Sequence, residues 1–228
     1  MVRSGDQMHV YLVNQVNQIL RRLSMFGGEP ALWTTFDHLY FLEGDENGIE
    51  KLRQSWRDRN AFTPTGVKGA LQQQLPHSGI EDALASMYAE VARNRGWLRL
   101  DRTLTADEYT TLRTEIAPFT EHDRTLTDVV DAFGEPSVLF GGSNPRYSKS
   151  LAYATTDVSD PMVIFHLWNG VDPGTEPSWP PQYPEPILLA TRCGAGAFPT
   201  SFSFTPQGHS RRAHVWPTRH GPQGEPGS

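Results

Sequence analysis

His166 is the residue of this sequence with the clearest capacity for acid–base chemistry. It lies in the run Val-Ile-Phe-His-Leu-Trp-Asn, where the two-residue alternation of a strand places it on the same face as Ile164 and Trp168. An imidazole titrates near neutral pH, so His166 could act as a general base if a carboxylate from elsewhere in the chain oriented its ring. We favour a hydrogen-bonded histidine in the core or on a sheet face, because the sequence shows no catalytic partner for it.

Other residue types that carry chemistry lack the spacing that their reactions require. His209 and His214 alone approach the spacing of zinc ligands, and they lie in a loose tail. The run Gly141–Pro145 lacks the last glycine of a G-x-S-x-G nucleophile elbow, and Gly27–Gly28 has no P-loop lysine after it. Cys193 has no second cysteine to pair with. The sequence therefore predicts no metal and no cofactor, and it leans away from an enzyme without deciding the question.

A group of aromatic and polar residues is the best candidate for binding a partner. Its members come from the end of one strand and from the proline-rich stretch 172–186 that follows it: Trp168, Asn169, Asp172, Trp179 and Tyr183. Tryptophan and tyrosine dominate the energetic centres of protein interfaces, so this group could form a recognition surface. The same residues could instead pack as a core beneath a long loop, and the sequence leaves both interpretations open.

Composition and charge limit the classes of partner. The net charge is −6, and nucleic-acid affinity depends on clustered cations, so no nucleic acid is expected. The longest apolar runs, 162–165 and 187–190, are far shorter than the ~20 residues of a membrane span, so no membrane partner is expected. The first residues lack the apolar region of a secretory signal. The expected location is the cytoplasm, with a protein as the partner.

Helical patterning dominates the first half of the chain. Apolar residues recur with the 3.6-residue period, and glycine or proline interrupts them, which predicts helices over residues 10–23, 30–43, 46–58, 80–92, 106–116 and 125–133, with a short helix ending at Leu75. Thr105 and Glu108 have the spacing of a capping box, so a helix should begin at Ala106. Pro118 should end that helix.

The second half reads as a sheet. Strands are expected over residues 137–140, 147–153, 162–168, 187–192 and 198–204, with a further short strand over 97–100 and hairpin loops at 141–145 and 155–161. The predicted class is α+β, a helical N-terminal part packed with a small, mostly antiparallel C-terminal sheet. The expected organisation is a helical part over 1–120, a helix plus antiparallel sheet over 121–205, and a disordered tail over 206–228.

Two segments carry a resemblance to known proteins. The run Arg22–Gly28, Arg-Leu-Ser-Met-Phe-Gly-Gly, resembles the R-P-G-M-Y-x-G segment after the first helix of many small bacterial proteins, including immunity proteins of polymorphic toxin systems. Leu23 and Ser24 stand where that pattern has proline and glycine. The run 126–136, ending in Phe-Gly-Glu-Pro, and the strands after it are similar to small binding domains of actinobacterial proteins. The resemblance implies a protein-binding inhibitor and assigns no residue roles.

Three functions are compatible with these patterns. The first is a non-enzymatic protein-binding module, with an immunity-type inhibitor of a toxin as its specific form. The alternative is an enzyme of unfamiliar type with a pocket between the helical part and the sheet, where His166 would be the base. A DNA-binding regulator built on the helices of residues 31–75 is the third, and the net charge of −6 speaks against it.

Overall fold

In the described part of the chain, seven α-helices precede the first strand. The computed structural model describes residues 5–75, 79–170, 181–194 and 196–215. The helices before the sheet are α1 (Gly5–Arg21), α2 (Gly28–Leu42), α3 (Gly48–Asp58), α4 (Gly66–Gln72), α5 (Ile80–Asn94), α6 (Ala106–Thr120) and α7 (Leu126–Phe133), with a 3-10 turn η1 (Leu23–Met25) after α1. None of these described helices combines the length and apolar character that a bilayer span needs.

Five strands then form one antiparallel sheet in chain order. They are β1 (Val138–Gly141), β2 (Lys149–Tyr153), β3 (Val163–Trp168), β4 (Ile187–Cys193) and β5 (Phe202–Phe204), and each pairs with the next along the chain. The α+β class expected from the sequence is confirmed. Short hairpin connections suit this order, because antiparallel neighbours need no crossover.

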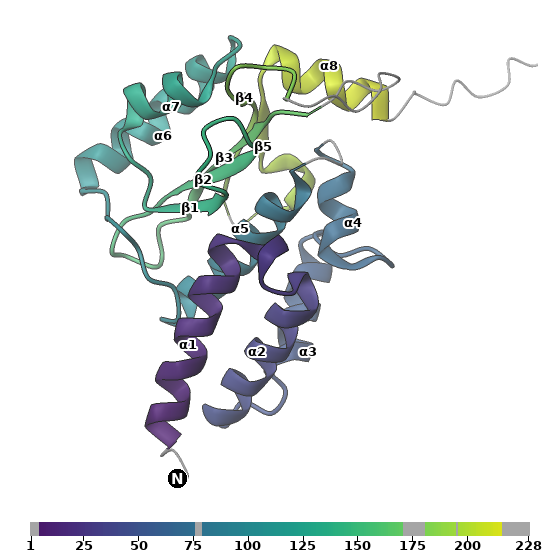
Figure 1. Ribbon diagram of the computed structural model, residues 1–228, viewed down its shortest axis with the longest axis vertical. Coiled ribbons are helices and arrows are strands. Elements are labelled where there is room, and N and C mark those ends of the chain that lie inside the picture. Colours follow the sequence, from purple (N-terminus) through teal and green to yellow (C-terminus); the bar gives the residue numbers. More distant parts are fainter. Residues whose placement is uncertain (1–4, 76–78, 171–180, 195, 216–228) are drawn as a thin grey trace, which may run out of the picture.

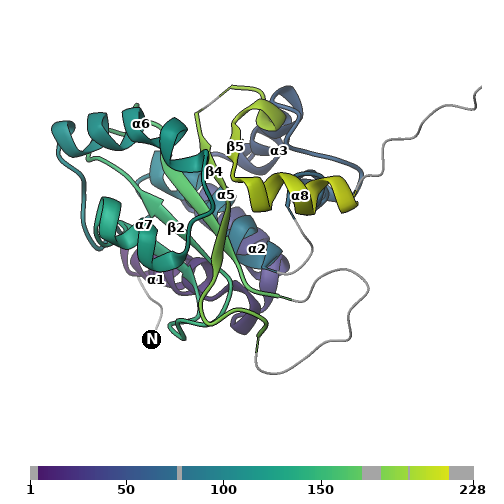
Figure 2. The ribbon, with the colours of Figure 1, turned by 90° about the horizontal axis from the view of Figure 1, so that it is seen from above.

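The sheet is covered on both faces (Figures 1 and 2). Helix α5 packs on β1 and β2 on one face, with α1 reaching β1 beside it. Helices α6 and α7 lie on the opposite side of the strands, as the view from above shows. Alternation along β3 divides its side chains accordingly: Ile164 and Trp168 belong to the core shared with α5, whereas Val163 and Phe165 belong to the core beneath α6 and α7.

Helix α6 therefore does not share the core of the N-terminal helices, although the sequence grouped all residues up to 120. Its inward residues Tyr109, Leu112 and Ile116 pack with the outer face of the sheet. The Thr105–Glu108 capping box is present as expected, with both reciprocal hydrogen bonds formed. The expectation that Pro118 ends the helix is wrong, because α6 continues to Thr120 with Pro118 in its last turn.

Two of the expected strands are corrected. Residues 97–100 form no strand, because the side-chain amide of Asn17 in α1 binds their backbone: it donates to the Trp97 carbonyl at 2.7 Å and accepts from the Arg99 amide at 2.8 Å. The expected strand over 198–204 begins as a 3-10 turn, η2 (Phe198–Thr200), and only its last three residues form β5.

The disordered tail expected from Pro206 is wrong over residues 206–215, which form helix α8 (Pro206–Val215). The buried Thr205 anchors its first turn, since its hydroxyl donates to the Leu188 carbonyl at 2.7 Å and accepts from the Gly208 amide at 3.2 Å. Gly208 lies directly on β4: a Cβ placed there would be 1.9 Å from the Leu189 carbonyl oxygen. Residues 216–228 lie outside the described part of the chain.

The close approach at Gly208 can be tested. Alanine in a helix is favoured over glycine by about 1 kcal/mol, so Gly208→Ala should stabilise α8 unless the β-carbon meets β4. We expect the clash to dominate and to lower stability by about 2 kcal/mol, with faster tryptic cleavage at Arg211 and Arg212 as α8 undocks. Thermal unfolding and limited proteolysis measure both effects. Gly196→Ala, which places no atom within 4 Å of its β-carbon, is the control. An unchanged or higher melting temperature in Gly208→Ala would contradict the docking.

Candidate functional site

The described members of the expected recognition group are brought together, but they pack inward. Trp168 is 3% exposed and its ring centroid is 6.1 Å from that of the half-buried Tyr183. Asn169 is 7% exposed, and its side-chain amide donates to the carbonyls of Arg146 and Tyr183, both at 2.8 Å. Asp172 and Trp179 lie outside the described residues.

Helix α8 covers this aromatic pair. The Arg211 guanidinium lies 4.1 Å from the centroid of the Trp168 ring and donates to the Tyr183 hydroxyl at 2.7 Å. A cation held over an indole face in this way stabilises the docking of the helix. The geometry of Trp168, Asn169 and Tyr183 is thus that of packing beneath a covering segment, the second of the two interpretations left open by the sequence.

His166 is also enclosed. Its Nδ1 atom lies 3.0 Å from the Ser150 hydroxyl on β2, and its ring stacks with Phe202 at a centroid distance of 5.9 Å. Burial, and secondarily the charge of Arg192, lowers the pKa of His166 well below its ordinary value, so the ring is neutral. The adjoining space holds about 10 Å³, too little for a substrate. A catalytic base at His166 would have no room to act.

A large open hollow lies where the helical part meets the sheet. We call it the hairpin groove, a space of about 580 Å³ between the end of α1 with η1, the first turn of α5, and the β1–β2 hairpin. Its lining comes from five separate segments: Arg22, Ser24 and Met25; Gly79, Glu81 and Asp82; Gly141, Gly142, Ser143 and Asn144; Tyr147 and Ser148; and Asn169.

Two glycines allow these segments to approach one another. Gly141 has φ of +115°, and a Cβ on it would lie 3.0 Å from the carboxyl carbon of Asp82. Gly79 precedes α5 with φ of +82°, and a Cβ there would lie 2.9 Å from the Cβ of Ser148. Both positions combine a left-handed backbone with a close neighbour, which only glycine tolerates. The carboxylate of Asp82 is thereby held against the end of β1.

Asp82 and Lys149 give the groove its electrostatic character. Lys149 is 2% exposed, and its ammonium donates to the carbonyls of Gly142 at 3.3 Å and Asn144 at 2.8 Å, which closes the hairpin loop. Burial lowers the pKa of this ammonium. Burial also raises the pKa of the Asp82 carboxyl to about 7, because the attraction of Lys149 offsets the desolvation only in part.

The groove is also lined by apolar side chains. Met25 in the lining is 68% exposed and Tyr147 in the lining is 38% exposed, and Phe26, next to Met25 in the chain, is 44% exposed. Several of these segments were noted in the sequence for other reasons, the Arg22–Gly28 motif and the Gly141–Pro145 loop among them. Asp82 was not, since an acidic residue in the first turn of a helix is ordinary capping chemistry. The one available signal was Lys149, a lysine at the start of an apolar strand.

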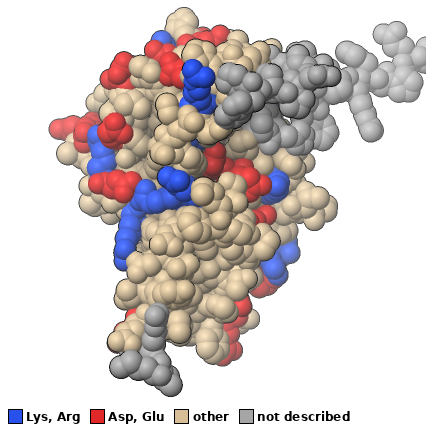
Figure 3. All heavy atoms as spheres, viewed as in Figure 1, with Lys and Arg blue, Asp and Glu red and all other residues tan. Residues whose placement is uncertain are grey.

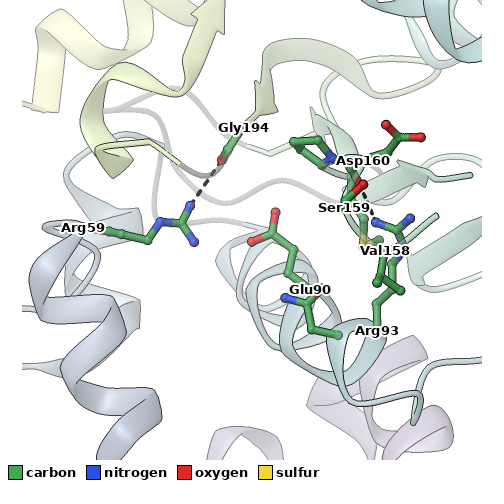
Figure 4. A pocket seen from close by; sticks show the side chains of 10 residues that line it. Arg59, Glu90, Arg93, Val158, Ser159, Asp160 and Gly194 are labelled. Carbon is green, nitrogen blue, oxygen red and sulfur yellow. Dashed lines mark hydrogen bonds between the residues drawn. The ribbon is translucent and has the colours of Figure 1, made fainter.

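A smaller pocket of about 110 Å³ lies at the other end of α5 (Figure 4). Two guanidiniums border it and both are bound to backbone: Arg59 donates to the carbonyls of Gly194 and Gly196, each at 3.2 Å, and Arg93 donates to the Asp160 carbonyl at 2.6 Å. Glu90 faces this pocket and accepts from the buried Arg192 at 2.7 Å. These charged groups hold loops and strands in place.

No group of three or more potential metal ligands occurs among the residues that the structure describes. Comparison with protein-family models, curated proteins and solved structures gives no significant match to this chain. The hairpin groove is therefore the candidate site on the basis of its geometry and chemistry alone.

The raised pKa of Asp82 predicts a pH dependence of stability. The Asp82 carboxyl has an ordinary pKa of 3.8 in the unfolded chain and a pKa of about 7 in the folded protein. Between pH 3.8 and about pH 7, the folded protein therefore keeps a proton that the unfolded chain has released, so the free energy of unfolding falls as the pH rises through this range. Asp82→Asn should abolish this fall and raise the free energy of unfolding above pH 7 by on the order of 2 kcal/mol, allowing for partial exposure. Denaturant titrations at several pH values measure it. Asp107→Asn, an exposed first-turn change in α6, is the control. An unaltered pH profile in Asp82→Asn would refute the assignment.

Proposed function

We propose that this protein is a non-enzymatic protein-binding module that receives a segment of its partner in the hairpin groove. One observation carries the proposal: the lining of a groove of about 580 Å³ includes two exposed apolar side chains, Met25 and Tyr147. Methionine and aromatic side chains in such positions are characteristic of binding surfaces, because they bury large apolar areas on contact and methionine adapts its shape.

The charge of the chain indicates the kind of partner. With a net charge of −6, the protein attracts basic surfaces and repels acidic ones. Charged side chains gather over the sheet and α6 in the upper part of the face drawn in Figure 3, while the lower part over α1 carries few. An immunity-type inhibitor that covers a basic toxin is the specific form we propose. Its support is this charge and the resemblance of the Arg22–Gly28 segment, which contributes a wall of the groove.

Substitution of Met25 tests the binding function. The tagged protein, expressed in its native host, should retain a near-stoichiometric protein partner, and Met25→Asp should weaken that complex at least tenfold, since a buried charge replaces an apolar contact. Met8→Asp is the matched control, because Met8 is also exposed but lies about 20 Å away along α1. Affinity capture followed by titration with the purified partner measures the loss. Repeated recovery of the chain alone, or equal binding by Met25→Asp, would sink the proposal.

A second candidate function is an enzyme that uses the same groove, and the raised pKa of Asp82 favours it. A carboxyl with a pKa of about 7 in an open groove has the acidity of a general acid or base, a role that His166 cannot fill. Screening against ester, phosphate-ester and glycoside substrates should then reveal a turnover that Asp82→Asn reduces at least a hundredfold. Absence of any turnover sensitive to Asp82→Asn would leave the binding module as the function.

A further inference from the structure

The two acidic side chains that border the hairpin groove differ in their partners. Glu81 is paired with Lys68 of α4 at 2.7 Å. Asp82, one residue on, makes no hydrogen bond or ion pair within the described part of the chain, and it is half-buried between the first turn of α5 and the end of β1. A partly desolvated carboxylate of this kind lacks the compensation that buried charges normally receive. Once it ionises, above its pKa of about 7, it is the anionic group of the groove that remains available.

The cations around the groove do not supply that compensation. Lys149 reaches toward Asp82 from β2, but its ammonium already donates to two carbonyls of the hairpin loop. Arg22, at the end of α1, has its guanidinium 4.0 Å from the sulfur of Met25. A positive charge entering from solvent would therefore meet an anionic site whose own neighbours are committed elsewhere, with carbonyl oxygens of the hairpin loop beside it.

The apolar residues of the groove suit the stem of a long basic side chain. Met25 of η1 and Tyr147 of the β1–β2 hairpin both line the groove and are exposed, so the methylene groups of such a stem can pack on them while the charged head approaches Asp82. A tyrosine ring also attracts a cation placed over its face. A bare metal ion fits less well, since it needs several ligating side chains and no such group occurs among the described residues.

We propose that the hairpin groove recognises a lysine or arginine side chain of the bound protein, with the Asp82 carboxylate accepting hydrogen bonds from the charged head and Met25 and Tyr147 holding its stem. This inference rests on the proposed protein-binding function and specifies the chemical group of the partner that the groove binds. It also accounts for the presence, in an acidic chain, of a groove-lining carboxyl group that has no hydrogen-bond or ion-pair partner among the described residues.

Short capped peptides test this recognition directly. Acetyl-Gly-Arg-Gly-amide and acetyl-Gly-Lys-Gly-amide are titrated into the full chain at a pH above the Asp82 pKa of about 7, and amide resonances of Gly141, Gly142 and Asn144 are followed by NMR. We expect saturable shifts with a Kd of about 1 mM, the range for a single side chain. The citrulline peptide, which keeps the shape of arginine without its charge, should bind at least tenfold more weakly. The Asp82→Asn variant should likewise bind the arginine and lysine peptides at least tenfold more weakly than the wild type does. The Asp107→Asn variant should bind them like the wild type.

Each outcome decides the question. Equal binding of the citrulline and arginine peptides, no saturable shift for either basic peptide, or full binding by Asp82→Asn would overturn the proposal. If Asp82→Asn fails to fold, the comparison of citrulline with arginine on the wild-type protein still decides it. A native partner captured equally by wild type and Asp82→Asn but lost in Met25→Asp would leave the binding module standing without this recognition. Binding of the basic peptides without any native protein partner would support the recognition of a basic side chain and contradict the protein-binding function.

Discussion

The burial of α5 between the other N-terminal helices and the sheet is the constraint on which the structure depends. Small residues along this helix, Ala83, Ala85, Ala89 and Ala92, are almost fully buried, so the strands and α1 can both approach its backbone closely. A helix covered on nearly every side fixes the direction of both its ends. One end presents Asp82 to the hairpin groove, and the other brings Glu90 to the buried Arg192 of β4.

A β-bulge between β3 and β4 affects how the C-terminal helix α8 packs on the sheet. Between His166 and Leu167 of β3 the register with β4 shifts by one residue, so Leu189 has no partner on β3. Such a bulge reverses the facing of side chains beyond it. Leu188 accordingly joins the core under α6 and α7, while Arg192 faces α5. The carbonyl of Leu189 is also where Gly208 docks, so the same irregularity positions α8 over Trp168.

The packing of α5 against the hairpin determines the position of the hairpin groove, and desolvation determines its electrostatic character. Asp82 and Lys149 face each other across the point where α5 meets the β1–β2 hairpin, and burial disfavours the charge on both. Lys149 recovers its lost hydration from the carbonyls of the loop, whereas Asp82 gains no hydrogen bond from the described residues. Because of this difference Lys149 is part of the scaffold, whereas Asp82 lines the groove without a hydrogen-bond partner among the described residues.

The sequence by itself determined the α+β class, the positions of most helices and strands, the Thr105 capping box and the shared face of Ile164, His166 and Trp168, because periodicity and capping are local. Only the tertiary structure decided the environment of Asp82, the enclosure of His166 and the formation of α8. Each of these depends on which distant segments remove water from a group or accept its hydrogen bonds. The composition of residues 206–215 predicts disorder, because the sequence does not show that Gly208 can pack against the carbonyl of Leu189.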